Sequence, residues 1–424
     1  DRARDMVVQQ GAAPDGRSLV LNQIPGPLSL TISDYSSTVW ALTDQPGDPD
    51  AGFSGDGQLN VQFGGSSEAD PAGLALFVDA NFIPDLLIGA TSVFDDNWAV
   101  ALHEPLTGAL LDSENEVLTE ALLGPGDTGT AHAATGAAQW GFVMGWRTVG
   151  GNDEGLVAAY SGGSNAVPNG TILGGTFPGI PGGLGLQSRA LDGTVLLEQS
   201  GFDFVANLIT LVHYFQWDGD EQVSHQTHLV RISEESTAEN TAVLSDLDGE
   251  RPLAVSQFRI TNEEGSGPED SLILVATLTP DNTIRVSAYE VDTASGIEIL
   301  ADAVWDIAVD GLQTNDLNDI ALSETLFTDP LTRHIYVGGS TASGQPLLVA
   351  LDPSDGLEHQ RWSGRDLGLK AYGHVVSAQP VTPIYEQPDF FIEPVTHLQV
   401  LIDAYVDGRW QSLVKRIPFV ALVD

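Results

Sequence analysis

DPDAGFSGDGQLNVQFGG, at residues 48–65, opens the stretch of sequence that decides the fold. It is followed by AGLALFVDANFIPDLLIGATSV at residues 72–93 and by DNWAVAL at residues 96–102. Four runs of Val, Leu, Ile, Ala and aromatic residues, at 59–63, 74–77, 86–89 and 98–102, alternate here with Gly, Asp, Asn and Pro. These last four types end strands because they tolerate turn dihedrals. Four short strands with tight turns form an antiparallel unit that cannot bury its faces alone, so copies must stack.

The last strand of this unit recurs along the whole chain. Its copies end at Leu42, Leu102, Tyr160, Ile232, Tyr289, Leu351 and Ile417, at spacings between 57 and 72 residues. Three of the turns that follow also agree, with EPLTG at 104–108, DTASG at 292–296 and DPSDG at 352–356. Unrelated strands of a β-sandwich would alternate between apolar and polar residues but would not show this long period. The sequence therefore predicts an internal repeat.

The segment GFSGDG at 52–57, with QLNVQFGG, GLALFVDANFIPDLLIGA and WAVALHEPLTGALLDS after it, resembles the delta-60 repeat of bacterial secreted and surface proteins. That repeat has the form FGGDGxV…A.A..PDGKI.VAG…ALARYNPDGSLD. The N-terminal part shows the same pattern, with MVVQQGAAPDGRSLVLNQ from Met6 and TVWALTDQPGDPD from Thr38. The match is clear for residues 5–110, recognisable for 318–360 and degraded between 115 and 300. The resemblance implies that the units are blades of a β-propeller, and such repeats specify architecture far more than activity.

We therefore expect an all-β fold, a single seven-bladed β-propeller closed by a C-terminal strand. The expected blades are residues 1–56, 57–113, 114–170, 171–238, 239–298, 299–360 and 361–417, with the closing strand at 418–424. The first unit has no counterpart of the run at 59–63, and PFVALVD at 418–424 would supply that strand and remove two exposed sheet edges. Six blades would result if the N-terminal 50 residues formed a cap, and eight if residues 208–215 belonged to a separate blade.

Negative charge dominates the composition, with 59 acidic and 16 basic residues and a formal net charge of −43. Only Lys370 and Lys415 are lysines. A field of this sign repels nucleic acid and anionic membrane surfaces, so neither is an expected partner, whereas cations and basic surfaces are attracted. Abundant Asp and Glu with few Lys are typical of a surface adapted to a salty medium, where screening suppresses self-repulsion. We therefore expect a marine or halophilic source.

Several features bear on the compartment. Cysteine does not occur, so disulfides and thiol chemistry are excluded. No run approaches the ~20 apolar residues of a spanning helix, so we expect no membrane insertion. No signal peptide is recognisable, and the start at Asp1, a few residues before a strand, suits a processed mature end. Together with the family resemblance, these features predict an extracellular or cell-surface protein, with the periplasm as the alternative.

The turn at residues 48–57 carries the strongest candidate for a metal site. Asp48, Asp50 and Asp56 offer three carboxylates, and ligands that are all oxygen suit calcium, which is the one candidate cofactor. The spacing is not that of an EF-hand loop, and Asp and Gly acting as ordinary turn residues explain the pattern more simply. His225 and His228, at i and i+3, would point to opposite faces of a strand and do not indicate zinc.

Catalytic motifs are not recognisable. No GxSxG elbow occurs, and in the glycine-dense segment at 150–185 no phosphate-binding loop opens a helix. Adjacent acidic residues are expected on solvated loops in a chain that has 59 of them. An enzyme is therefore the runner-up, in the form of a calcium-dependent hydrolase or lyase with its site at the channel mouth.

The fourth unit departs most from the repeat. Its spacing of 72 residues is explained by an inserted hairpin, with residues 208–215 in one strand and Asp218-Gly219 as its turn. Trp217 lies at the expected tip beside Phe215 and Tyr214, and an aromatic side chain at a loop tip is available to a partner. We therefore predict these three residues as the binding site, although packing of Trp217 in the core or at the rim explains its presence more simply.

The eight tryptophans are spread along the chain, and Trp40 and Trp98 occupy equivalent positions of the repeat, which predicts packing between blades. The sequence as a whole favours an exported, non-catalytic propeller scaffold or binding module that contacts a protein or a glycan as part of a larger surface assembly. The alternatives are the hydrolase or lyase and a structural subunit of an extracellular filament or layer.

Overall fold

The computed structural model of the 424-residue chain describes residues 2–9, 17–25, 35–42, 51, 53–61, 69–78, 84–92, 97–112, 126–137, 140–161, 169–172, 186–200, 203–218, 221–232, 238–259, 271–292, 297–313, 322–323, 334–381 and 397–418. Within these ranges the regular structure is β-strand, apart from one short 3₁₀ helix, η1 (Ser245–Leu247). The expected all-β fold is confirmed. No helix in the described ranges is long and apolar enough to cross a membrane.

The described strands form seven separate antiparallel sheets, each built from consecutive segments of the chain. The first sheet contains β1 (Arg2–Gln9), β2 (Arg17–Pro25), β3 (Tyr35–Leu42) and β4 (Gln58–Asn60). The second contains β5 (Ala69–Val78), β6 (Pro84–Ser92), β7 (Asn97–His103) and β8 (Leu110–Asp112). The third contains β9 (Thr128–Ala137), β10 (Trp140–Val149), β11 (Asn152–Ser161) and β12 (Asn169–Ile172).

The remaining four sheets follow the same order. The fourth contains β13 (Gln187–Ser200), β14 (Asp203–Asp218), β15 (Glu221–Ile232) and β16 (Ala238–Val243). The fifth contains β17 (Arg251–Arg259), β18 (Ser271–Leu278), β19 (Ile284–Asp292) and β20 (Glu298–Ile299), and β21 (Trp305–Ala308) also pairs with β19. The sixth contains β22 (Leu322–Ser323), β23 (Ile335–Ser340), β24 (Pro346–Leu351) and β25 (Glu358–Ser363). The seventh contains β26 (Tyr372–Val381), β27 (His397–Val406) and β28 (Arg409–Pro418).

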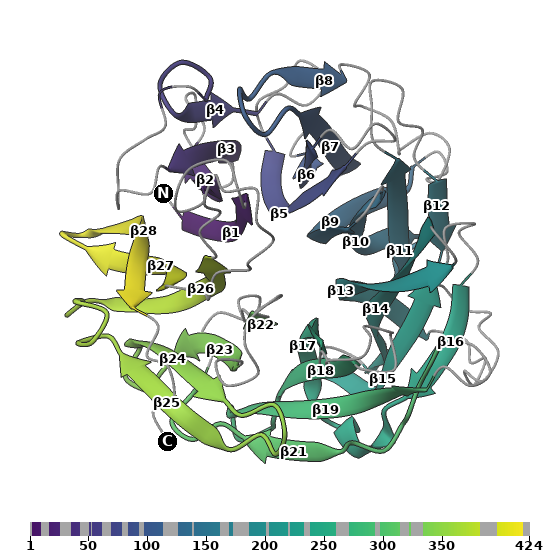
Figure 1. Ribbon diagram of the computed structural model, residues 1–424. Coiled ribbons are helices and arrows are strands. Elements are labelled where there is room, and N and C mark those ends of the chain that lie inside the picture. The colour runs from purple at the N-terminus through teal and green to yellow at the C-terminus, as the bar shows by residue number, and fades with distance from the viewer. Residues whose placement is uncertain are drawn as a thin grey trace.

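The sheets are arranged radially in a ring, with β1, β5, β9, β13, β17, β22 and β26 nearest the centre (Figure 1). Within each sheet the chain moves outward, because each strand pairs with the strand that follows it in sequence, except that β21 of the fifth sheet pairs with β19. The last strand of one sheet then leads to the first strand of the next. This radial repetition of small antiparallel sheets is the architecture of a β-propeller.

Each sheet is buried on both faces, because successive side chains of a strand point in opposite directions. In β6, Leu86 and Ile88 pack with Leu19 of the first sheet, whereas Leu87 between them packs with Val143 of the third. The same alternation continues around the ring, with an apolar cluster between each pair of neighbouring sheets. A fully buried Leu or Ile side chain contributes about 1.5–3 kcal/mol, so these clusters are the main source of stability.

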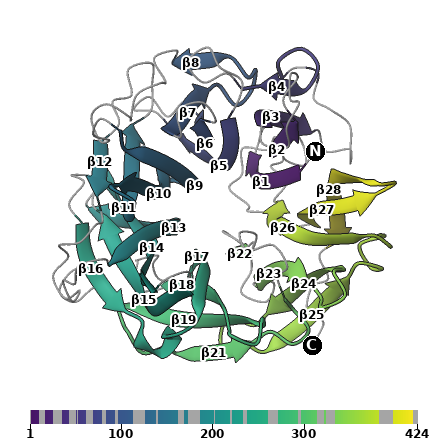
Figure 2. The ribbon, with the colours of Figure 1, turned by 180° about the vertical axis from the view of Figure 1, so that it is seen from behind.

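The ring closes by packing between the first and seventh sheets, and β1 lies beside β26 when the molecule is seen from either side (Figures 1 and 2). The cluster between these sheets consists of Ala3, Met6, Val20, Val376 and Leu401, with Val414 packed against it. The side chains of Asn22 and Ser412 are hydrogen-bonded across the same boundary. Among the described residues, closure therefore depends on faces that pack and not on a shared strand.

The repeat is confirmed at two of the predicted turns. In both, the Gly amide donates to the first carbonyl of the turn at 2.8 Å, from Gly108 to Glu104 and from Gly356 to Asp352. Each Gly has a φ of +73° and lies against an aromatic ring of the preceding sheet region, Phe53 in one case and Trp305 in the other. The turn predicted at 292–296 lies outside the described residues beyond position 292.

A second repeated feature joins innermost strands through partly buried Asp side chains. Asp5 follows a β-bulge in β1 and accepts hydrogen bonds from the amides of Met6 (2.7 Å) and of Leu74 in the next sheet (2.8 Å). Asp192 follows a bulge in β13 and accepts from its neighbour Gly193 (2.8 Å) and from Val255 in the next sheet (2.9 Å). Burial raises the pKa of Asp192 to about 7, although both amide donors oppose this rise.

The expected boundary between the first two blades is wrong. Residues 58–60 form β4, which pairs with β3 through Thr38–Asn60, Val39–Leu59 and Trp40–Gln58, so this run ends the first sheet and does not begin the second. Gly57 directly precedes β4, has a φ of +81° and donates its amide to the carbonyl of Phe53 at 2.8 Å. The first sheet is therefore not short of a strand, and the reason for assigning it a C-terminal closing strand disappears. Residues 419–424 lie outside the described residues.

The fourth unit contains the predicted hairpin, because β14 and β15 pair up to Asp218 and Glu221, but these are the regular second and third strands of the fourth sheet, so the prediction of an insertion is wrong. Residues 208–215 belong to β14, a central strand of the fourth sheet, so the proposal that they form a separate blade is wrong. Residues 2–9, 17–25 and 35–42 form a sheet of the ring, so the proposal of an N-terminal cap is wrong as well. A pattern of apolar runs identifies strands, but it does not say which strands pair.

Candidate functional site

Aromatic residues lie at the end of the seventh sheet at which its innermost strand, β26, begins, and two of them are exposed. Tyr372 of β26 lies opposite Tyr405 of β27, which lies opposite Trp410 of β28. Directly opposite residues point to the same face of a sheet, so the three rings form one line across it. We call Tyr372, Tyr405 and Trp410 the aromatic row.

The aromatic row is open to solvent and geometrically fixed. Tyr372 is 63% exposed and Tyr405 43% exposed, which makes them the two aromatic residues among the exposed large apolar side chains of the described chain. The rings of Tyr405 and Trp410 meet edge to face, with centroids 5.6 Å apart. A two-residue turn holds them opposite each other, with φ of +53° at Asp407 and +83° at Gly408. Positive φ at both central residues is the geometry of a tight type I′ hairpin.

On the same face, the residues next to the aromatic row lie further from solvent and pack beneath its rings. His374 lies opposite Asp403, and Asp403 lies opposite Ser412. His374 is 7% exposed and Asp403 is fully buried, and the His374 ring lies 6.4 Å from the ring of Trp410. Because Ser412 contacts Asn22, this face leads directly into the boundary with the first sheet. The row is thus an exposed end of a packed inter-sheet face, placed where the ring closes.

The residues predicted from the inserted hairpin lie elsewhere. Tyr214 is 1% exposed and Phe215 is fully buried, because β13 pairs with this part of β14, with Gln187 opposite Phe215 and Ser188 opposite Tyr214. These two side chains are core residues and are not available to a partner. Trp217 lies in β14 with its backbone opposite Gln222, and its side chain lies outside the described part of the structure.

Next to Phe215, a cluster of charged side chains connects the third and fourth sheets. The Arg189 guanidinium lies 4.5 Å from the ring centroid of Trp146 and 5.0 Å from that of Phe215. Its Nε and Nη2 donate to one oxygen of Asp153 at 2.8 and 2.5 Å. Arg147 pairs with Glu154 at 2.7 Å beside it. The charged groups of this cluster pair with one another, so the cluster holds the two sheets together.

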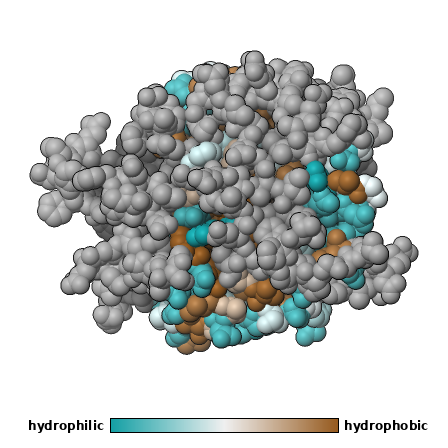
Figure 3. Space-filling model, turned by 90° about the vertical axis from the view of Figure 1, so that its right-hand side faces the viewer, coloured by the Kyte–Doolittle hydropathy of each residue, from teal (hydrophilic) through white to brown (hydrophobic). Residues whose placement is uncertain are grey.

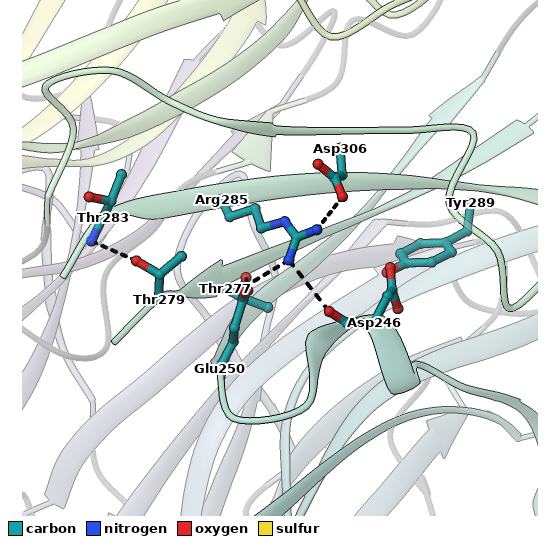
Figure 4. Close-up of polar contacts among 8 residues, drawn as sticks. All are labelled: Asp246, Glu250, Thr277, Thr279, Thr283, Arg285, Tyr289 and Asp306. Carbon is teal, nitrogen blue, oxygen red and sulfur yellow. Dashed lines mark hydrogen bonds and ion pairs between the residues drawn. The ribbon is translucent and has the colours of Figure 1, made fainter. Parts of the chain in front are cut away.

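A second such cluster fastens the start of the fifth sheet (Figure 4). Arg285 of β19 donates to Glu250 at 2.8 Å and also pairs with Asp306 of β21, while Thr277 donates to Glu250. Burial opposes the charge on Arg285, but hydrogen bonds to Glu250 and Asp306 outweigh it and raise the pKa of the guanidinium. Tyr289 donates to Asp246 of η1 at 3.2 Å. These contacts hold the segment around η1 against β19. The carboxylates of Glu250, Asp306 and Asp246 all have partners within this cluster.

The predicted calcium ligands are described only in part. Asp48 and Asp50 lie outside the described residues. Asp56 is exposed, and its Oδ1 accepts the amide of Gln58 at 3.0 Å, as expected of a turn residue. Within the described ranges, no three His, Asp or Glu side chains are placed to hold a metal ion together. A calcium site at Asp48, Asp50 and Asp56 stays a prediction.

The tryptophan prediction can be compared at Trp98, since the side chain of Trp40 lies outside the described part. Trp98 is 2% exposed and belongs to the cluster between the second and third sheets. Its Nε1 donates to the carbonyl of Trp146 in the third sheet at 3.3 Å. Trp305 does the same between the fifth and sixth sheets, where Nε1 donates to the carbonyl of Pro353 at 2.9 Å. Packing between blades is confirmed for Trp98.

No family model matches the chain, and no curated protein matches it. Among solved structures, a fungal lectin from Aleuria aurantia, described as a six-bladed β-propeller with a novel fucose recognition mode, is 12% identical, with 83% of this chain and 96% of that chain covered and a TM-score of 0.37. The SapL1 lectin in complex with alpha methyl fucoside is 14% identical, with 85% and 98% covered and a TM-score of 0.37. A Hadza microbial sialidase, Hz136, is 7% identical, with 98% and 66% covered and a TM-score of 0.46. At these identities and TM-scores, neither a ligand nor a reaction carries over to this chain.

Proposed function

We propose that the protein is a non-catalytic β-propeller module that binds a glycan through the aromatic row. The observation that carries this proposal is the row itself, with Tyr372 and Tyr405 largely exposed on a sheet face that is otherwise packed. A sugar ring presents an apolar C–H face and a polar hydroxyl edge. Aromatic faces with polar tips complement both, because Tyr and Trp combine a large apolar body with a hydrogen-bonding group.

The size of the row favours a glycan over a folded protein partner. An aromatic side chain offers about 150–250 Å² when fully available, so three partly exposed rings present a few hundred Å² at most. A stable protein interface buries about 800 Å² on each partner around an apolar centre. On the opposite side of the ring, the described residues that reach the surface include both hydrophilic and hydrophobic ones (Figure 3). One or two sugar units fit the area of the row.

Several expectations from the sequence accompany this proposal. We take the seven sheets as the blades of a seven-bladed propeller built from delta-60 repeats, exported to the cell surface or the extracellular medium and part of a larger surface assembly. The charge of −43 supports a salty medium and disfavours nucleic acid and membranes as partners. Calcium would act at the turn of residues 48–57 as a stabilising ion.

The test is glycan-array binding by the wild type, followed by titration of the best ligand. Tyr372→Ala and Tyr405→Ala should each weaken binding at least tenfold, which corresponds to about 1.4 kcal/mol. Tyr372→Phe and Tyr405→Phe keep the ring and should retain most of the affinity. Leu357→Ala is the matched control, since Leu357 is 58% exposed and lies in a turn of the sixth sheet. Equal affinity of all variants would remove the site, and turnover in a broad hydrolase screen would favour the enzyme alternative.

A further inference from the structure

Two basic side chains beside the aromatic row differ from the paired arginines of the other sheets. Ion pairs elsewhere in the described ranges join Arg4 to Asp70, Arg147 to Glu154, Arg189 to Asp153, Arg285 to Glu250 and Asp306, and Arg361 to Glu358. Lys370 and Arg409 are exposed, and neither side chain has an ion pair or a hydrogen bond in the part of the chain that the structure describes. In a chain with 59 acidic and 16 basic residues, these two cations are available to a ligand.

The two cations lie at opposite ends of the aromatic row. Lys370 comes two residues before Tyr372, which begins β26, and Arg409 begins β28 directly before Trp410. Tyr405 is the middle ring, because it pairs with both Tyr372 and Trp410. Neighbouring strands are about 4.8 Å apart, so the row spans about 10 Å from the first strand to the third. A ligand laid along the three rings has a cation beside each of its ends.

Arg409 borders the row and does not cover it. Successive side chains of a strand point to opposite faces, so Arg409 and Trp410 project from different faces of β28. Arg409 directly follows the turn at Asp407 and Gly408, at the exposed end of the hairpin. A ligand that extends past the Trp410 ring therefore meets the guanidinium, whereas a ligand confined to the rings does not.

The exposed charge at this end of the seventh sheet is positive, although the whole chain is acidic. The connection into β26 and the tip of the β27–β28 hairpin contain five exposed charged residues, Arg365, Asp366, Lys370, Asp407 and Arg409. Three of the five are basic, which leaves one positive charge. Asp403 also lies beneath the row, but it is fully buried opposite His374 and is not presented to a ligand. Charges beyond the Debye length, about 8 Å at 0.15 M salt, are largely screened, so the local cations dominate the field at the row.

We propose that the glycan bound by the aromatic row is acidic, with carboxylate or sulfate groups that lie beside Lys370 and Arg409. This inference rests on the glycan binding proposed above and specifies the class of sugar. The three rings stack on the apolar C–H faces of the sugars, and the two cations pair with negative groups beyond the ends of the row. Hydrogen bonds between charged groups are about twice as strong as neutral ones. An acidic glycan therefore gains contacts that a neutral chain of the same shape lacks.

The test compares acidic glycans with neutral counterparts of the same backbone. One pair is an oligogalacturonate and its methyl ester, which tests carboxylates, and the other is a sulfated galactan oligosaccharide and its desulfated form. Calorimetric titration at 0.15 M NaCl should show at least one acidic member bound tenfold or more tightly than its counterpart. If the neutral members bind equally well, or if a glycan array binds neutral sugars alone, glycan binding stands and the preference for acidic sugars is wrong. An array that binds nothing removes the proposed function itself, and this inference with it.

Charge variants locate the preference within the site. Lys370→Gln and Arg409→Gln should each weaken the acidic member about three- to tenfold and leave the neutral member within about twofold. Raising NaCl from 0.15 M to 1 M should also weaken the acidic member, because exposed charges are screened. Lys415→Gln is the matched control, since it removes one positive charge from the same strand at five residues, or about 16 Å, beyond Trp410. An equal loss in Lys415→Gln, or unchanged binding in both Lys370→Gln and Arg409→Gln, would overturn the proposal.

Discussion

Strands β24 and β28 occupy the same place in their sheets, yet their surroundings differ. β24 reads PLLVAL and all six residues are buried, because neighbouring sheets cover its two faces and β25 covers its outer edge. β28 reads RWQSLVKRIP, and most of its side chains are half-buried beside a sheet boundary that the aromatic row enters. The comparison shows that radial position alone does not set burial. What covers a strand decides which residues the strand can hold.

The largest expected effect tests this contrast directly. Leu348→Ala in β24 should lower the free energy of unfolding by about 2–5 kcal/mol, because it opens a cavity in a fully buried cluster. Val414→Ala in β28 should cost about 1 kcal/mol or less, because the side chain is half-buried and little buried surface is lost. Chemical denaturation of both variants measures the difference. Equal losses would mean that β28 is covered as well as β24.

A second test compares two glycines with the same backbone angle. Gly356 and Gly368 both have a φ of +73°, but a Cβ on Gly356 would lie 2.5 Å from the Trp305 ring, whereas one on Gly368 would meet nothing within 4 Å. Gly368→Ala should cost about 1–2 kcal/mol from the left-handed backbone alone. Gly356→Ala should cost about 1–3 kcal/mol more, since the ring must shift. Thermal denaturation should separate the variants, and identical midpoints would contradict the packing of this turn on Trp305.

A third test uses pH on the Asp192 carboxyl, whose pKa is raised by desolvation. The pKa of Asp192 is raised from 3.8 to about 7 in the folded protein, so the folded state holds the proton more tightly than the unfolded chain does. The contribution of this group to stability is therefore complete below pH 3.8 and is lost as pH rises towards about 7. The difference in unfolding free energy between the wild type and Asp192→Asn should fall across this range. Parallel pH profiles of the two proteins would contradict the assignment.

The smallest effect concerns the acidic surface. With a net charge of −43, self-repulsion opposes the compact state at low ionic strength. The Debye length shrinks from ~30 Å at 0.01 M to ~3 Å at 1 M salt, so the melting temperature should rise gradually with NaCl. Calcium should produce the same rise at lower concentration. A melting temperature that is flat in both salts would rule out adaptation to a salty medium.

Much of the fold could be predicted from the sequence because its signals are local. Runs of Val, Leu and Ile between Gly, Asp and Pro marked the strands, and the turns EPLTG and DPSDG have the same hydrogen bonds in the structure. The partner of a strand is not a local property. Residues 58–60 pair backward with β3, and no apolar pattern distinguishes that pairing from one with the strand that follows.

The site was harder to predict, because exposure depends on what the rest of the ring places beside a residue. Tyr214 and Phe215 belong to the predicted hairpin, but β13 runs far enough to cover them. Tyr405 and Trp410 flank Asp407 and Gly408, a strong hairpin signal that could have placed the two rings opposite each other. That Tyr372 joins them from the far side of β27 required the complete sheet.

The packing of alternate side chains onto opposite neighbours has an evolutionary consequence. Leu86 and Leu87 are adjacent in the chain, yet one is constrained by the first sheet and the other by the third. Each sheet therefore contributes side chains to two separate apolar clusters, and each set must fit a different neighbouring sheet. A substitution on one sheet alters the space available to the side chains of the next sheet, so it favours a compensating substitution there. The repeats can lose their resemblance to one another only by changing together.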